Sequence, residues 1–370
     1  MVDYRLQPRH SFADRDHCIG ELIGVNTCFV AQRSRRSVLG LLGLTVIAFF
    51  VRANDAQELP CTSRKMAVSF RDGQNLPLGN VSVADLEAKL HGKQVKLVSL
   101  APDSRPHRIV LVIDNSGSMA TEEGDPALWP LGISLATHFF QENRERAQIA
   151  ILFFNSQVTD EVHFAQGNPA VGEKLQQVAQ DPHYERSHIR GKTALRDAIF
   201  QATLLLDHPT SADAIYVLTD GGDNASHESA AELDRRLAVT SVRVFAVLLY
   251  RGPPYRDRTP EEETGPRDLA DMAHKTGGEI LTAAEWRGKR VALSANADAR
   301  VNSEEMLNRL YKTIFQDQLL EIELPSPIKL NERWELHFSK AARHQYKNSR
   351  IVYPDTLISC DAEVYGAGRN

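Results

Sequence analysis

The sequence is poor in cysteine, in aromatic residues and in long apolar runs. Four cysteines stand among 370 residues, aromatic side chains make up 7% of the chain, and the formal net charge is only −5. Because basic residues are dispersed beyond the N-terminal segment, the charge pattern does not point to nucleic acid. Apart from one apolar run near the N-terminus, no stretch is long and apolar enough to span a bilayer.

Motifs of several enzyme classes are also missing. The sequence contains no Gly-rich phosphate loop, no paired zinc-ligand motif and no nucleophile elbow. No constellation of a general base and a nucleophile stands out either. We therefore predict that the chain is not an enzyme. Its hydrophobic content of 42% is nevertheless ample for a large folded core.

The N-terminal residues 1–53 are typical of an export signal. A basic stretch at 33–37 precedes the apolar run 38–51, and small residues near 51–53 suit a cleavage site. Residues 34–39 resemble a twin-arginine signal, although Val38 stands where that pattern prefers phenylalanine. We expect a periplasmic or extracellular protein that begins near Asn54. An uncleaved leader, which would anchor the chain to the membrane, and a later start of translation are the alternatives.

Export would leave only two of the cysteines in the mature chain. Cys18 and Cys28 lie in the leader, whereas Cys61 and Cys360 stand near the two ends of the mature protein. In an oxidising compartment this pair forms either one disulfide or two free thiols. The sequence leaves both alternatives open.

Strand and helix patterns alternate through the middle of the chain. This alternation predicts a largely parallel sheet with helices on both faces. The apolar run at 109–113 is uninterrupted, as expected of a strand buried on both sides. We predict strands at 109–113, 148–154, 214–218, 242–249 and 279–282, and helices at 126–143, 170–180, 193–206, 226–238, 266–275 and 303–318.

Small oxygen-bearing side chains stand where these apolar runs end or where helices begin. They are Asp114, Ser116, Ser118, Thr193 and Asp220. The carboxyl ends of parallel strands meet at one edge of a sheet, where ligands bind. Mg²⁺ prefers oxygen ligands and is usually held by one or two carboxylates together with neutral oxygens and waters. We therefore predict that the five residues ligate one Mg²⁺ or Mn²⁺. For each residue taken alone, capping of a helix or turn is the alternative.

Three short motifs carry a resemblance to a known family. DNSGSM at 114–119, GKT at 191–193 and LTDG at 218–221 resemble the metal-ion-dependent adhesion site (MIDAS) of von Willebrand factor type A domains in order and approximate spacing. The resemblance covers roughly residues 105–285 and implies a doubly wound, Rossmann-like α/β fold. It also implies that Asp114, Ser116 and Ser118 hold the ion, and that Thr193 and Asp220 contact it directly or through water.

The same resemblance implies a function. A partner's Asp or Glu would complete the coordination of the ion, which makes the chain an exported, metal-dependent module for protein binding or adhesion. The alternatives are an accessory subunit or hydrolase that uses Mg²⁺ catalytically, and a site that only holds the loops together. The sequence identifies neither the partner nor the oligomeric state.

Residues near the motifs are further candidates. His183 and His188 would add metal ligands, Asp223 would contact a metal-bound water, and Arg190 with Lys192 would attract an acidic partner. For each of these residues, the simpler interpretation is that it is a solvated residue of a loop or turn without a role in the site. The segment 251–266 is rich in Pro, Gly and charge, and we expect an exposed loop there that contacts a partner or is a simple insertion.

Both ends of the mature chain show short strand patterns. Residues 66–100 contain strands and turns, and residues 319–354 contain three or so further strands. We predict one small β module built from both ends, similar to the segments that flank the type A domain in exported bacterial proteins first noted in acidobacteria. The expected organisation is a leader at 1–53, a β segment at 54–104, the type A domain at 105–300, a helix at 301–318 and a β-rich segment at 319–370.

Overall fold

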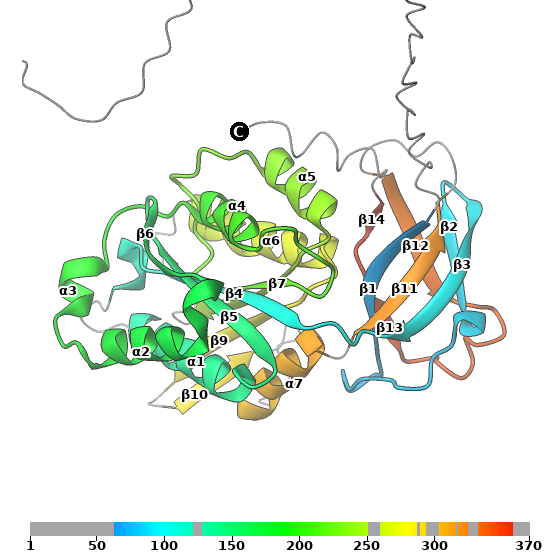
Figure 1. Ribbon diagram of the computed structural model, residues 1–370, viewed down its shortest axis with the longest axis horizontal. Helices are drawn as coiled ribbons and strands as arrows, with labels where there is room; N and C mark the ends of the chain where they lie inside the picture. The colour runs from blue at the N-terminus through cyan, green and yellow to red at the C-terminus, as the bar shows by residue number, and fades with distance from the viewer. Residues whose placement is uncertain are drawn as a thin grey trace, which may run out of the picture. The chain divides into compact units, whose positions relative to one another are not determined.

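The computed structural model describes residues 63–120, 128–250, 260–286, 289–293, 303–315, 317–324 and 332–357. The leader, Cys61, Cys360 and residues 251–259 lie outside these ranges, so the predictions made for them stay predictions. Within them, no helix combines the length and the apolar character that crossing a membrane requires. The strands form two sheets, which we call the α/β sheet and the antiparallel sheet (Figure 1).

The α/β sheet is the predicted, mostly parallel one. Its five parallel strands are β4 (His107–Asp114), β5 (Ala147–Phe154), β7 (Ala214–Thr219), β8 (Arg243–Tyr250) and β9 (Ile280–Trp286). Two strands that the sequence did not predict, β6 (Val158–Val162) and β10 (Lys289–Leu293), close the edges in antiparallel orientation. The order is β10-β9-β8-β7-β4-β5-β6, so the chain reverses its direction of winding at β4.

Strand β4 lies between β7 and β5 in this sheet and is buried on both sides. Ile109, Leu111 and Ile113 belong to one hydrophobic core, whereas Val110 and Val112 belong to the core on the opposite face. Successive side chains of a strand point to opposite faces, so a central strand covered by helices on both sides requires an apolar residue at every position. The structure therefore confirms the burial that the uninterrupted apolar run predicted.

Helices cover both faces of the α/β sheet (Figure 1). The first core is completed by α1 (Leu128–Asn143), α2 (Gly167–Gln180), α3 (Tyr184–His188) and α7 (Ser303–Phe315). The second is completed by α4 (Leu195–Leu205), α5 (Ala230–Thr240) and α6 (Pro260–Lys275). This arrangement is the doubly wound α/β fold that the alternating pattern predicted.

The helix prediction was wrong in several details, among them the start of α5, which we placed at 226 and which lies at Ala230. Residues 260–266, which we assigned to a loop, form the first part of α6 with Pro266 inside the helix. The last helix ends at Phe315, because Gln318 already pairs as the first residue of a strand. Helix α3 was not predicted, since five residues are too few to show a helical period.

Both chain ends build the antiparallel sheet, as predicted, although the module is larger than the small one expected. Its strands are β1 (Ser63–Arg71), β2 (Leu86–Leu90), β3 (Lys93–Pro102), β11 (Gln318–Glu323), β12 (Glu332–Phe338), β13 (Arg350–Val352) and β14 (Thr356–Leu357). The order β13-β1-β11-β3-β2-β12-β14 interleaves the two ends of the chain. The seven strands surround a separate hydrophobic core.

Candidate metal site

Asp114 is the last residue of β4 and is completely buried. Its Oδ1 accepts a hydrogen bond from the backbone N–H of Ser116 at 2.8 Å, and its Oδ2 accepts one from the hydroxyl of Thr219 at 2.6 Å. Thr219 ends β7, the neighbour of β4 on the side where the winding reverses. The carboxylate is therefore held between the ends of the two strands that flank the topological switch point, which is where open α/β sheets bind their ligands.

Ser116 and Ser118 lie on the turn that follows β4. The turn is a short 3₁₀ helix, Gly117–Met119, and it brings the two hydroxyl oxygens to 3.1 Å from each other. Ser116 is fully buried, as is Asp114. The turn therefore brings together two of the side chains that we predicted to ligate one ion.

Thr193 lies two residues before α4 and is also buried. Its backbone N–H donates to Oδ1 of Asn224 at 2.9 Å, and its carbonyl accepts from the N–H of Asn224 at 2.9 Å. This reciprocal pair joins the Thr193 segment to the loop that follows Asp220. We predicted that the helix begins at Thr193, but Leu195 is its first residue, so Thr193 belongs to the preceding loop.

Asp220 follows β7 directly and is half-buried. A Cβ atom built on Gly222 would lie 3.8 Å from Oδ1 of Asp220 and 3.8 Å from the hydroxyl oxygen of Thr193. The two predicted ligands therefore face the same small volume from different loops. The structure thus gathers Asp114, Ser116, Ser118, Thr193 and Asp220 at one edge of the sheet.

The two aspartates interact electrostatically. Burial and, second, the charge of Asp220 raise the pKa of the Asp114 carboxyl to about 7, against hydrogen bonds from Thr219 and Ser116 that lower it. Placing a second carboxylate beside a fully buried one is unfavourable unless a proton or a cation compensates the charge. The donor set of carboxylate and hydroxyl oxygens, without sulfur or imidazole, suits a hard divalent cation.

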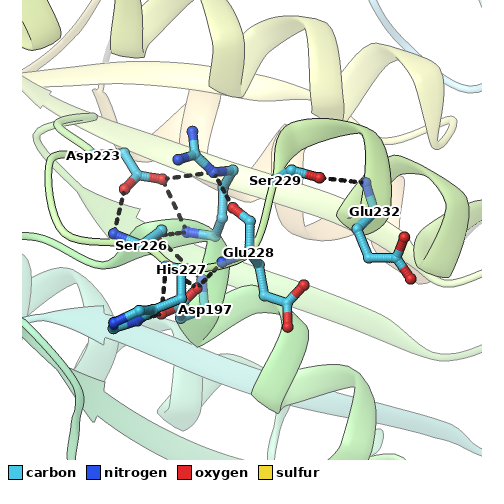
Figure 2. Close-up of polar contacts among 8 residues, drawn as sticks. Asp197, Asp223, Ser226, His227, Glu228, Ser229 and Glu232 are labelled. Carbon is cyan, nitrogen blue, oxygen red and sulfur yellow. Dashed lines mark hydrogen bonds and ion pairs between the residues drawn. The ribbon is translucent and has the colours of Figure 1, made fainter. Parts of the chain in front are cut away.

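A polar cluster around Asp197 holds the loop of Asp220 against α4. Figure 2 shows the Asp197 carboxylate accepting from the backbone N–H groups of His227 and Glu228, at 2.8–3.0 Å, and from Nδ1 of His227 at 3.0 Å. Burial alone would raise the pKa of Asp197, but these hydrogen bonds outweigh it and hold the pKa below its usual range. Asp197 therefore remains an anion that fixes residues 227 and 228.

The same cluster caps the first turn of α4 from outside the helix (Figure 2). The backbone N–H of Arg196 donates to Oγ of Ser226 at 3.0 Å and to Oδ2 of Asp223 at 3.2 Å. Nε of Arg196 lies 3.4 Å from the same Asp223 oxygen. Since the first N–H groups of a helix lack partners inside it, this loop supplies them. Asp223 thus caps α4, which favours the plainer interpretation over contact with a metal-bound water.

The two candidate histidines lie at α3: His183 precedes the helix and His188 is its last residue. His188 stacks on Tyr184 with ring centroids 4.1 Å apart, and its Nδ1 lies 2.8 Å from the hydroxyl of Ser187. His183 is exposed. Across the described ranges, no group of three or more His, Cys, Asp and Glu side chains is arranged to hold a metal ion. The structure therefore gives no support to these histidines as ligands.

The sequence did not single out Thr219, Asn224, Asp197 or Ser226 as parts of the site. Of these, Thr219 carried a usable signal, because a threonine immediately before the aspartate at a strand end can reach the neighbouring strand end. Asp197, Asn224 and Ser226 act through contacts that span about thirty residues along the chain, and no local pattern reports such contacts.

Fold and site together define a doubly wound α/β domain with a cluster of oxygen-bearing side chains at its switch point. The sequence profile of the von Willebrand factor type A domain matches residues 109–222, which run from β4 to the loop after Asp220. The chain therefore carries a von Willebrand factor type A domain. The finer resemblance to the acidobacterial group stays a prediction.

Solved structures give weaker likenesses. BatB from Bacteroides thetaiotaomicron is 14% identical with a TM-score of 0.38, and the match covers 56% of this chain and 98% of that one. A von Willebrand factor type A protein from Catenulispora acidiphila is 12% identical with a TM-score of 0.37, covering 82% and 75%. The pilus adhesin SpaC from Lactobacillus rhamnosus GG is 12% identical with a TM-score of 0.37, covering 73% and 46%. Comparison with curated proteins gave no match.

Proposed function

We propose that the type A domain is an exported, metal-dependent module for protein binding or adhesion. In this proposal Asp114, Ser116, Ser118, Thr193 and Asp220 hold one Mg²⁺ or Mn²⁺. The observation that carries it is the meeting of two aspartates and three hydroxyl residues, from three separate loops, at the switch point of the sheet.

The chemistry of the donor set supports a divalent cation. Two carboxylates nearly neutralise such an ion, and hydroxyl oxygens add ligands without adding charge. Asp114 is fully buried and Asp220 is half-buried, so Asp114 would hold a cation inside the protein and Asp220 would hold it where solvent reaches the site. When bound, the ion would supply an electrophilic coordination position that accepts a carboxylate oxygen of a partner's Asp or Glu.

The neighbourhood of the site supports binding rather than catalysis. A hydrolase would need a base free to take a proton from the reacting group. The nearby carboxylates of Asp197 and Asp223 are instead occupied by backbone N–H groups and by Arg196. We therefore propose that the domain is not an enzyme, and that the site's use is recognition.

Export is part of the proposal and rests on the leader pattern in residues 1–53. An acidic partner would then meet the domain outside the cytoplasm. Free Mg²⁺ would have to be present there at a concentration comparable to the dissociation constant of the site.

The test measures metal binding and metal-dependent capture together. Isothermal titration should detect Mg²⁺ binding to the wild type, little or none to Asp220→Asn and Thr193→Val, and unchanged binding to Asp207→Asn, whose side chain is 85% exposed. A glutamate-containing peptide should bind only with Mg²⁺, and its glutamine analogue should not bind.

Three results would contradict the proposal. Peptide binding that persists in a chelator would exclude the metal from recognition. Turnover of a phosphate or ester that requires Asp220 would favour the hydrolase. An Asp114→Ala variant that fails to fold, while Asp220→Asn folds and retains partner binding, would make the site structural.

A further inference from the structure

Three cations lie on the segment that leads into Thr193, one of the proposed ligands. Arg186, Arg190 and Lys192 are all exposed, and we call them the basic rim. Within the part of the chain that the structure describes, none of the three side chains forms an ion pair. The one acidic residue between positions 185 and 192 is Glu185, and the whole chain has a net charge of −5. The rim is therefore a local excess of positive charge on an acidic protein.

The backbone of the rim is fixed to the metal-binding turn. The carbonyl of Gly191 accepts from the N–H of Gly117 at 3.0 Å, and Gly117 lies between Ser116 and Ser118. The N–H of Arg190 donates to the carbonyl of Asn115 at 3.2 Å. Arg190 and Lys192 flank Gly191, so both begin directly beside the turn that carries the proposed ligands.

A second contact fixes the other side of the rim. The N–H of Lys192 donates to the hydroxyl of Ser156 at 3.0 Å, and Ser156 lies in the turn between β5 and β6. The N–H of Ala194 donates to the carbonyl of Asn155 in the same turn at 2.7 Å. The segment from Arg190 to Ala194 is thus hydrogen-bonded on both sides, and its cations emerge from a fixed position.

We infer that the partner presents a cluster of carboxylates rather than a single one. One carboxylate would occupy the ion, and acidic residues next to it in the partner would contact Arg190 and Lys192, with Arg186 further along the rim. This inference rests on the proposed function, because it concerns the surroundings of the same capture site. Its basis is charge complementarity beside a site that itself accepts an anion.

The physical effect of such a rim is moderate and depends on salt. Exposed ion pairs contribute little individually and are screened over about 8 Å at physiological ionic strength. Two such pairs correspond to an affinity gain of about threefold to tenfold, together with faster association at low salt. The rim therefore favours partners that carry several carboxylates. The ion makes at least one carboxylate necessary for binding.

The test compares two labelled peptides of equal length by fluorescence anisotropy, in excess Mg²⁺ and in a chelator. One carries a single glutamate among glycine and serine, and the other carries the same glutamate flanked by aspartates. The wild type should bind the flanked peptide about threefold to tenfold more tightly at low salt, and the difference should shrink at high salt. Arg190→Gln combined with Lys192→Gln should abolish the difference and leave the binding of the single-glutamate peptide almost unchanged.

A charge-matched control separates the rim from general electrostatics. Lys340→Gln with Lys347→Gln removes two exposed cations that follow β12 in the antiparallel part of the chain, and it should leave the preference intact. The inference would be overturned if the wild type bound both peptides equally, or if this control lost the preference for the flanked peptide as fully as the rim variant does. In either case, binding that still requires Mg²⁺ would uphold the proposed function. A rim-dependent preference that persists in the chelator would support the rim and contradict the metal-based function.

Discussion

The hydroxyl of Thr219 donates a hydrogen bond of 2.6 Å to Oδ2 of Asp114, and so links the ends of two neighbouring parallel strands. The same hydroxyl oxygen accepts the N–H of Gly221 at 3.0 Å. Both side chains are fully buried. Thr219 thus orients the Asp114 carboxylate and fixes the start of the loop that contains Asp220.

We predict that Thr219→Val, which keeps the shape of the side chain, lowers the free energy of unfolding by about 1–3 kcal/mol. The substitution leaves a buried carboxylate oxygen of Asp114 and the N–H of Gly221 without this hydrogen-bond partner. Denaturant unfolding in a chelator measures this loss. Thr219→Ser retains the hydroxyl and should recover most of the stability. A valine variant as stable as the wild type would show that the hydrogen bond contributes nothing measurable.

The pKa of Asp114 predicts how the stability of the metal-free protein depends on pH. Because this pKa is raised from 3.8 to about 7, the folded protein binds more protons than the unfolded chain between these values. The contribution of Asp114 to stability is therefore fully present below pH 3.8 and is lost as the pH rises towards 7, by an amount on the order of 4 kcal/mol if all else is equal.

The measurement is denaturant unfolding at several pH values with and without Mg²⁺. In a chelator, Asp114→Asn should lack the part of the pH dependence between pH 4 and 7 that the wild type shows. Mg²⁺ should stabilise the wild type most above pH 7, where Asp114 is ionised, and least near pH 5, because a cation competes with the proton for the carboxylate. A stabilisation by Mg²⁺ that does not change with pH would contradict this linkage.

Asp197 is not one of the five candidate ligands, but we predict that its substitution weakens Mg²⁺ binding. Asp197→Ala removes the acceptor of the His227 and Glu228 N–H groups, so the loop of Asp220 should lose its attachment to α4. We expect about a tenfold loss of Mg²⁺ affinity, as is usual for groups that orient metal ligands. Asp207→Ala, at an exposed position two residues beyond the end of the same helix, is the matched control and should change neither affinity nor stability. Unchanged affinity in Asp197→Ala would show that Thr193 and Asn224 alone hold the loop.

The central strands and the five candidate ligands could be predicted because their signals are local. Residues 109–113 are apolar at every position, and an aspartate at the end of such a run stands out. The doubly wound architecture follows from the order of strands and helices, since a parallel connection needs a helix to cross the sheet.

The remaining parts depend on contacts that no window of the sequence contains. The edge strand β6 has only half-buried side chains over most of its length, so its pattern is weak. Strand β14 is two residues long and exists only because β12 pairs with it. For Asp223 the sequence favoured a turn residue over contact with a metal-bound water, but it gave no sign that the side chain caps α4, which begins beside it in space.

Gly191 provides the last prediction, because its backbone joins the basic rim to the turn that carries Ser116 and Ser118. Its φ angle is +87°, and an added Cβ would lie 3.1 Å from the hydroxyl oxygen of Ser156. Gly191→Ala should therefore cost about 1–2 kcal/mol in stability, which thermal unfolding measures. If the variant relieves its strain by moving the loop, the hydrogen bond from the N–H of Gly117 to the carbonyl of Gly191 lengthens. The affinities for Mg²⁺ and for the flanked peptide should then fall together. Gly79→Ala is the control, since an added Cβ there meets nothing within 4 Å. Loss of stability with unchanged binding of both ligands would show that the turn of Ser116 and Ser118 keeps its shape without Gly191.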